Sequence, residues 1–208
     1  MQEAALRTEK SEKSMDSILK AAFRVIARES ISGTSTAKIA KEAGVSKPLL
    51  HYHFNTKETI LGKVLQHEVL ERLLEIPLEN ANKNLTAWGE IEGIFKRHKQ
   101  AISGDPDLLV VFYDFWVQGV KFPEIRKIIV QRFEAFRGYV GQLVSEGMER
   151  GEFTSEKAYT LPPVLLSFLE GASLQLISDP NAFNYDLYQY MALDMLSHMT
   201  GMNQEKQP

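Results

Sequence analysis

The chain has 208 residues, which is enough for one or two domains with a substantial core, and its composition of 44% hydrophobic and 25% charged residues is ordinary for a soluble globular protein. It contains no cysteine, which excludes disulfides, thiolate metal ligands and a cysteine nucleophile. The net charge of −3 is unevenly divided: residues 1–60 hold 10 basic and 7 acidic side chains, whereas the remainder is acidic. This division favours a phosphate-binding surface near the N-terminus.

The first ten residues are polar and are expected to form a mobile arm. Ser11 or Ser14 can cap the first long helix, whose apolar face includes Ile18, Phe23 and Ile26. Residues 1–17 do not resemble a signal peptide, and the lack of cysteine suits a reducing compartment. We therefore expect a cytoplasmic protein.

A short helix is predicted directly after residue 34. Ser35 and Thr36 are favourable helix caps, and small and apolar residues follow them at helical spacing. The pattern stops at Gly44, because glycine readily takes the left-handed conformation that ends a helix. The tight turn that follows leads into a second helix.

The second helix is also short and begins after Ser46, which is a favourable cap. Pro48 falls in its first turn, where the missing N–H costs no hydrogen bond. Asn55 and Thr56 end this helix, and Thr56 caps a third helix that begins at Lys57. Two short helices joined by a glycine turn form a helix-turn-helix, whose second helix can enter the major groove of DNA.

The segment from Ile39 to Leu61, IAKEAGVSKPLLHYHFNTKETIL, resembles the DNA-binding segment of the TetR family of bacterial repressors. Those proteins typically read I-A-x-x-A-G-V-S-x-x-x-L-Y-x-H/Y-F-x-x-K-E-x-L. The positions that fit are Ile39, Ala40, Ala43, Gly44, Val45, Ser46, Leu50, His53, Phe54, Lys57, Glu58 and Ile60. His51 stands where the family usually has Tyr.

A helix N-terminus in the major groove presents Lys47, Pro48 and Leu49 to base edges. The Lys47 ammonium can donate to guanine, and the two apolar side chains can contact a thymine methyl group. Phosphates are in reach of further polar side chains around the same helix and of two helix N-termini. The candidate DNA-binding residues are Thr36, Ser46, Lys47, Pro48, Leu49, His51, Tyr52, His53 and Lys57. The alternative is that Lys47 and Lys57 are ordinary solvated surface charges.

No enzyme motif is found, and no catalytic site, cofactor or metal site is expected. His51 and His53 are two residues apart on a helix, so their side chains point about 200° apart and cannot easily share one ion. A membrane span is not expected either. The longest apolar stretch, Leu161 to Ile177, is interrupted by two prolines and Glu170.

The third helix is expected to run from Lys57 to about Glu75 and to connect the N-terminal part with the rest. Residues 80–84 give the strongest linker signal in the chain. The following segments show helical periodicity and no strand alternation: 85–102, 107–119, 123–150, 155–178 and 185–199. Thr160 can cap the fourth of these, which would place Pro162 and Pro163 harmlessly in its first turn.

The sequence therefore predicts an all-α protein. Residues 1–60 form a three-helix DNA-binding domain with a helix-turn-helix, and residues 61–208 form a bundle of about six helices for ligand sensing and dimerisation, as the resemblance implies. The segment from Phe168 to Pro180 additionally resembles the C-terminal domain of the subgroup that includes the betaine-pathway repressor.

One recognition helix covers only a few base pairs, so a two-fold dimer on a near-palindromic operator is expected. The last two helices are the candidates for its interface, with an internal helix pair as the alternative. The expected interface residues are Leu165, Phe168, Leu169, Gly171, Ala172, Leu176, Leu187, Met191 and Met195.

An apolar cavity for an unknown small-molecule effector is expected in the second domain. Its candidate lining is Phe95, His98, Phe112, Tyr113, Trp116, Phe133 and Phe168, although aromatic residues at helical spacing also suit a plain core. The leading hypothesis is a ligand-responsive repressor that binds operator DNA as a homodimer. The alternative is a DNA-binding protein of the same fold without an effector.

Overall fold

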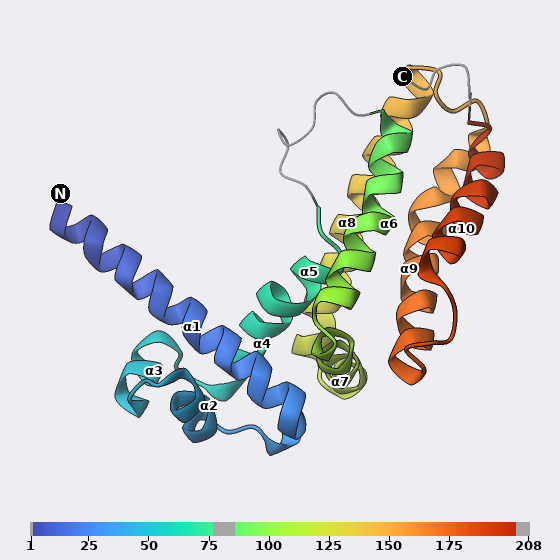
Figure 1. The fold of residues 1–208 in the computed structure, drawn as a ribbon. Coiled ribbons are helices and arrows are strands. Elements are labelled where there is room, and N and C mark those ends of the chain that lie inside the picture. Colours follow the sequence, from blue (N-terminus) through green and yellow to red (C-terminus); the bar gives the residue numbers. More distant parts are fainter. Residues whose placement is uncertain (1, 77–85, 203–208) are drawn as a thin grey trace. The chain divides into compact units, whose positions relative to one another are not determined.

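Residues 2–76 and 86–202 are described by the structure, a computed structural model, and side chains are described from residue 11 onward. Every regular element in these ranges is a helix, which confirms the all-α prediction (Figure 1). The elements are α1 (Gln2–Gly33), α2 (Thr36–Ala43), α3 (Lys47–His53), α4 (Lys57–Lys63), η1 (Val64–Leu70), α5 (Glu71–Leu73), α6 (Ala87–Gly104), α7 (Asp107–Lys121), α8 (Pro123–Glu149), η2 (Glu156–Thr160), α9 (Leu161–Ser178) and α10 (Tyr185–Thr200). The expected linker at 80–84 lies outside the described residues.

The chain forms two compact units. The first unit contains residues 1–72 and 106–129, and the second contains residues 73–105 and 130–208. The first unit extends past residue 60, because the helix that starts at Lys57 and the later helix α7 both pack against α1. The first unit therefore combines the helix-turn-helix with a helix from the middle of the chain.

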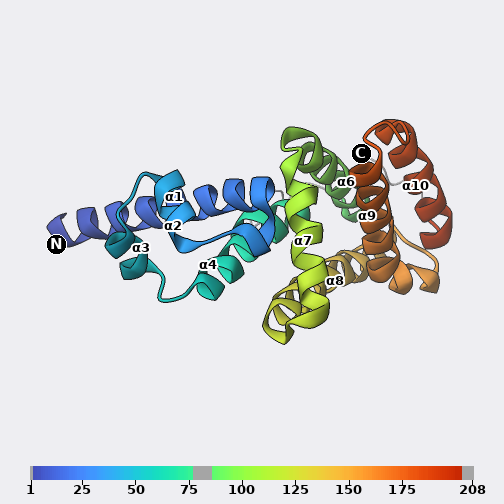
Figure 2. The same cartoon turned by 90° about the horizontal axis from the view of Figure 1, so that it is seen from below.

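Helix α1 begins at Gln2 rather than at Ser11 or Ser14, so neither serine is a cap. Residues 2–13 contain good helix formers and no glycine or proline, so nothing in their sequence stops the helix. Among the side chains described from residue 11 onward, the first buried ones are those of Ile18 and Leu19. In both views the part of α1 before them extends past α2 and α3 (Figures 1 and 2).

The end of α1 has an unusual backbone. Ser30 has φ 61° and ψ 170°, a region that side-chain-bearing residues rarely adopt. The next backbone N–H, that of Ile31, donates to the Asp114 carboxylate of α7 at 2.6 Å, and the Thr34 hydroxyl donates to the Ser30 carbonyl at 2.7 Å. These bonds hold the strained residue in place.

Helices α4, η1 and α5 form one continuous rod from Lys57 to Leu73, as the sequence predicted, but its middle has π-helical hydrogen bonding. The buried residues of the rod come in adjacent pairs: Ile60–Leu61, Val64–Leu65, Val69–Leu70 and Leu73–Leu74. The steps between pairs are four, five and four residues. The step of five falls within η1, where i+5 to i hydrogen bonds accommodate an extra residue without turning the buried face away from the core.

The second unit contains α6, most of α8, α9 and α10. Its core includes the fully buried side chains of Phe95, Phe136 and Leu165. Helices α9 and α10 lie side by side in both views. Pro162 and Pro163 fall in the first turn of α9 as predicted, whereas Thr160 makes no side-chain capping bond.

Candidate nucleic-acid interface

The turn between α2 and α3 is set by local hydrogen bonds that the sequence predicted. The Ser35 hydroxyl accepts the Lys38 N–H at 3.3 Å at the start of α2. At its end Gly44 has φ 66° and ψ 25°, and its N–H donates to the Lys41 carbonyl. The Val45 N–H then donates to the Ala40 carbonyl at 3.0 Å, which completes the helix-ending motif. The chain therefore reverses within very few residues and starts α3 at a fixed angle.

Helix α3 presents one apolar side inward and the rest of its surface outward. The Ser46 hydroxyl accepts the Leu49 N–H at 3.3 Å, so the first turn is capped. Leu50 and Phe54 are buried and anchor the helix. In contrast, Leu49 is 39% exposed and Tyr52 is 78% exposed. Both side chains are therefore accessible to another molecule.

The nine candidate DNA-binding residues all lie in the first unit. Six of them are exposed: Ser46, Lys47, Pro48, Leu49, His51 and Tyr52. Thr36, His53 and Lys57 are partly buried, and the His53 ring contacts the Tyr52 ring edge-on at 5.3 Å between centroids. Lys47 has no hydrogen-bonding or ion-pair partner among the described residues, so its ammonium is available to a ligand.

Lys57 has a role that the sequence pattern did not indicate. Its ammonium donates to the carbonyl of Ile31 at 2.9 Å, near the end of α1. A cation at a helix C-terminus is favourable because the carbonyl groups there lack partners. Lys57 therefore ties the start of α4 to the end of α1, whether or not it also contacts a phosphate.

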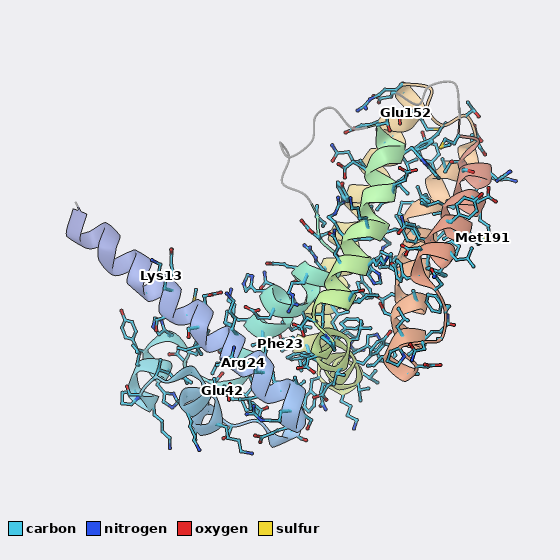
Figure 3. The ribbon with its side chains drawn as sticks, in the orientation of Figure 1. Lys13, Phe23, Arg24, Glu42, Glu152 and Met191 are labelled. Atoms are coloured by element: carbon cyan, nitrogen blue, oxygen red, sulfur yellow. The ribbon has the colours of Figure 1, made fainter. Side chains whose placement is uncertain are left out.

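Three cations of α1 and α2 are paired with carboxylates. Arg24 and Arg28 of α1 both contact Glu42 of α2, at 3.0 and 3.3 Å, and Figure 3 shows Arg24 and Glu42 pointing toward one another. Lys38 is paired with Glu29. Hydrogen bonds from Arg24 and then Arg28 lower the pKa of Glu42. These pairs join α1 to α2 and do not involve Lys47 of α3.

The expected effector-binding residues divide between the units. Phe112, Tyr113 and Trp116 belong to the first unit, whereas Phe95, His98, Phe133 and Phe168 belong to the second. Phe95 and Phe112 are fully buried. Within the described residues, no three His, Asp or Glu side chains form a group able to hold a metal ion.

His98 is buried and both of its ring nitrogens have partners. Nδ1 lies 2.7 Å from the Tyr185 hydroxyl of α10, and Nε2 lies 3.0 Å from the Ser173 hydroxyl of α9. Burial lowers the pKa of His98 to about 4, so the ring is neutral near pH 7. His98 thus joins three helices of the second unit instead of presenting a free polar group.

The expected interface residues fall into three groups. Leu165, Leu169 and Ala172 are buried within the second unit itself, Phe168, Gly171 and Leu176 are partly buried, and Leu187, Met191 and Met195 are exposed on α10. Helical spacing alone did not separate the inward side of α9 from its outward side. Figure 3 shows Met191 on the outer side of α10.

A family model described as "Bacterial regulatory proteins, tetR family" matches residues 18–64, which span the buried half of α1, the helix-turn-helix and the start of the rod. The chain belongs to the TetR family of transcriptional regulators.

Characterised relatives of this TetR-family regulator include the fatty acid metabolism regulator protein of Bacillus subtilis (strain 168), which is 27% identical over 135 residues, 65% of this chain and 68% of that protein. The regulator BetI of Brucella abortus (strain 2308) is 25% identical over 114 residues, 54% of this chain and 56% of that protein. The chain thus aligns with about two thirds of one relative and about half of the other.

Solved structures share the whole fold. FadR from Bacillus subtilis, in complex with stearoyl-CoA, superposes with a TM-score of 0.71 at 19% identity, covering 90% of this chain and 98% of that one. A putative regulator from Saccharomonospora viridis in complex with choline superposes with a TM-score of 0.72 at 20% identity, covering 90% of this chain and 97% of that one. Identities this low establish the TetR fold and nothing about ligands.

Proposed function

We propose that this TetR-family regulator is a ligand-responsive repressor that binds a palindromic operator as a homodimer through α3. Residues 1–60 would bind DNA, and residues 61–208 would dimerise and bind the effector in the cytoplasm. The observation that supports DNA binding most directly is the exposed surface of α3, where Lys47 has no partner among the described residues and Leu49 and Tyr52 are exposed although apolar. These side chains suit guanine edges, thymine methyl groups and phosphates respectively.

DNA binding is tested by fluorescence anisotropy with the intergenic DNA upstream of the gene, at a fixed salt concentration. We expect Lys47→Ala to weaken specific binding about tenfold and to change the sequence preference. The matched control is Lys96→Ala, which removes the same charge from an exposed position on α6 in the second unit. Equal affinity of the Lys47 variant and the control would refute the role of α3.

The proposed dimer interface uses the outward side of α9 and α10. Leu187 is 62% exposed and Met191 is 48% exposed, and both lie on the same face of α10 as Met195. On α9, Gly171 points outward, since a Cβ added there would meet no atom within 4 Å. The segment Glu156–Ser178 has the length and hydropathy to cross a membrane, and only 33% of its most apolar window is buried, so much of its apolar surface is uncovered. A partner helix would cover this surface equally well.

We expect a dimer by sedimentation at micromolar concentration and a monomer for Leu187→Glu combined with Met191→Glu. Tyr159→Glu, which adds a charge at another exposed position in the second unit, is the control and should leave the dimer intact. Loss of dimerisation should lower operator affinity by several orders of magnitude, because the two half-sites would then be bound independently.

The effector is tested with the two ligand types that the structural relatives contain, an acyl-CoA and choline. A ligand that binds the folded protein raises its melting temperature. We expect one of the two to do so and to lower operator affinity in the same buffer, since an effector must bind the two states unequally. Stabilisation without any change in operator affinity would favour the alternative, a DNA-binding protein of this fold without an effector response.

A further inference from the structure

The chain contains five histidines, and all five lie in the part of it that the structure describes. His98 is buried and both of its ring nitrogens are bonded. The rings of His67 and His198 each lie within 3.0 Å of an oxygen atom of a residue four positions away. His53 contacts the aromatic rings on either side of it in the sequence. His51 of α3 is exposed and has no hydrogen bond, ion pair or ring contact among the described residues, so its imidazole is available to a ligand.

His51 lies in the last turn of α3, on one side of its exposed surface. At about 100° per residue, Tyr52 lies roughly opposite the buried Leu50, and His51 lies about 100° from each of them. A recognition helix presents its first turn to the base edges, and contacts to the flanking phosphates fix its register in the groove. The position of His51, late in the helix and to one side, therefore suits a phosphate better than a base edge.

The surrounding protein supplies no anion to this imidazole. Lys47 lies one turn before His51 on the same side of α3 and is also exposed. None of the charged groups on the neighbouring helices forms an ion pair or hydrogen bond with His51 in the described part of the chain. These groups are Lys38, Lys41 and Glu42 of α2, which packs against α3, and Lys57 and Glu58 of α4, which follows it. An anion that pairs with a protonated His51 must therefore come from the bound ligand.

We propose that His51 pairs in its protonated form with a DNA phosphate, so that operator binding takes up a proton and strengthens as the pH falls. This proposal rests on the proposed binding of DNA through α3. Imidazole is the side chain that ordinarily changes charge between pH 5 and 8, and a neighbouring phosphate favours its charged form. Because the complex then holds more protons than the separated protein and DNA, lowering the pH in this range favours association. The Tyr that TetR-family regulators usually have at this position stays neutral over the same range.

The test is the ratio of affinities for the upstream intergenic DNA at about pH 6 and pH 8, measured by fluorescence anisotropy at one salt concentration. Each variant is compared with itself at the two pH values, so a change in its overall affinity does not affect the comparison. If a phosphate favours protonation of His51 by one pKa unit, the ratio is about sixfold for each subunit that contacts DNA. We therefore expect the parent to bind at least fivefold more tightly at pH 6.

Two substitutions remove the titrating group in different ways. His51→Tyr introduces the residue that the family usually has, and His51→Gln keeps hydrogen-bonding groups without a charge. We expect both to bring the ratio close to one, with circular dichroism confirming that each variant is folded at both pH values. His198→Gln removes an exposed histidine from α10 of the second unit and should keep the ratio of the parent. A parental ratio in both His51 variants, or its loss only in His53→Gln, would overturn the proposal.

The salt dependence of binding provides an independent measurement. A protonated His51 adds one phosphate contact per subunit, so the slope of log affinity against log salt should be steeper at pH 6 than at pH 8 by about one for each subunit bound. The slope of His51→Gln should be the same at both pH values. DNA binding whose affinity and salt slope do not depend on His51 would remove this proposal and leave the proposed function intact. Failure of the parent to bind DNA at either pH would refute both.

Discussion

The Asp114 carboxylate accepts the backbone N–H of Ile31 at 2.6 Å. The carbonyl of the same residue accepts the Lys57 ammonium at 2.9 Å. One residue at the end of α1 is therefore held by α7 on one side and by α4 on the other. The preceding residue, Ser30, has the only positive φ among the non-glycine residues that the structure describes.

Replacing Ser30 with glycine should stabilise the protein. Glycine adopts φ 61° and ψ 170° without steric cost, whereas a non-glycine residue there costs roughly 1–3 kcal/mol. After the entropy cost of glycine in the unfolded chain, we expect a gain of about 1 kcal/mol in the free energy of unfolding, measured with urea. Ser32→Gly, two residues away, is the control. A Ser30 variant no more stable than the control would show that the conformation is not strained.

Lys57→Ala should lower stability by about 1 kcal/mol, because it leaves the Ile31 carbonyl without its partner. If the ammonium also neutralised a phosphate, the slope of log affinity against log salt would fall by about one. We expect the Lys57 variant to have the same salt slope as Lys63→Ala, which removes an exposed lysine from the same helix. A drop of one unit found only in the Lys57 variant would establish the phosphate contact that the motif suggested.

His98 should make stability fall in acid. Burial lowers its pKa from 6.5 to about 4, so between these values the unfolded chain binds a proton that the folded protein does not. Its contribution to the free energy of unfolding is complete above pH 6.5 and is lost as the pH falls toward 4, by roughly 3 kcal/mol. His98→Gln retains hydrogen-bonding groups and should flatten this dependence in urea unfolding at pH 7.5 and 4.5. A fall as steep as that of the parent would assign the effect to other groups.

Glu170 should act in the opposite direction. Burial raises its pKa from 4.5 to about 7, so the folded protein holds a proton that the unfolded chain releases. The contribution of Glu170 to the free energy of unfolding is present below pH 4.5 and is lost as the pH rises through 7. We expect Glu170→Gln to exceed the parent in stability by roughly 2 kcal/mol at pH 8 and to match it at pH 4. Glu134→Gln, at an exposed position on α8, controls for the loss of a charge, and an equal gain there would contradict the prediction.

The helix-turn-helix was predictable because short-range interactions determine it. Ser35, Ser46 and Thr56 each accept a hydrogen bond from an N–H three residues later, and Gly44 ends α2 in the left-handed conformation. These features depend on neighbours in the sequence. The outward orientation of Lys47 follows from them, since α3 has only two turns and Leu50 must face the core.

The partners of the long-range polar groups were not predictable. His98 was expected to line an effector cavity, but it bonds to Ser173 and Tyr185, which lie 75 and 87 residues away in the chain. Likewise, helical spacing marks both Leu165 and Leu187 as apolar without showing that one is buried in the unit and the other is exposed. Such distinctions depend on how helices distant in sequence pack together.

One departure from a regular helix had a signal in the sequence that was missed. The apolar pairs of the rod after Lys57 are separated by four, five and four residues, and the five predicts the π-helical segment η1. A regular α-helix was expected there because the apolar residues after Lys57 were compared with the α-helical period of 3.6 residues along the whole segment. The spacing between successive pairs would have located the irregular turn.

Because η1 contains one extra residue, this rod should tolerate a single-residue deletion that would disrupt the packing of a regular buried α-helix. Removing Gln66, which is exposed, would bring all four apolar pairs to a uniform spacing of four and allow the segment to close as regular α-helix. Elsewhere in α4 or α5 the same deletion would rotate every downstream side chain by about 100°. Natural length variation in relatives of this chain is therefore expected to concentrate in these seven positions.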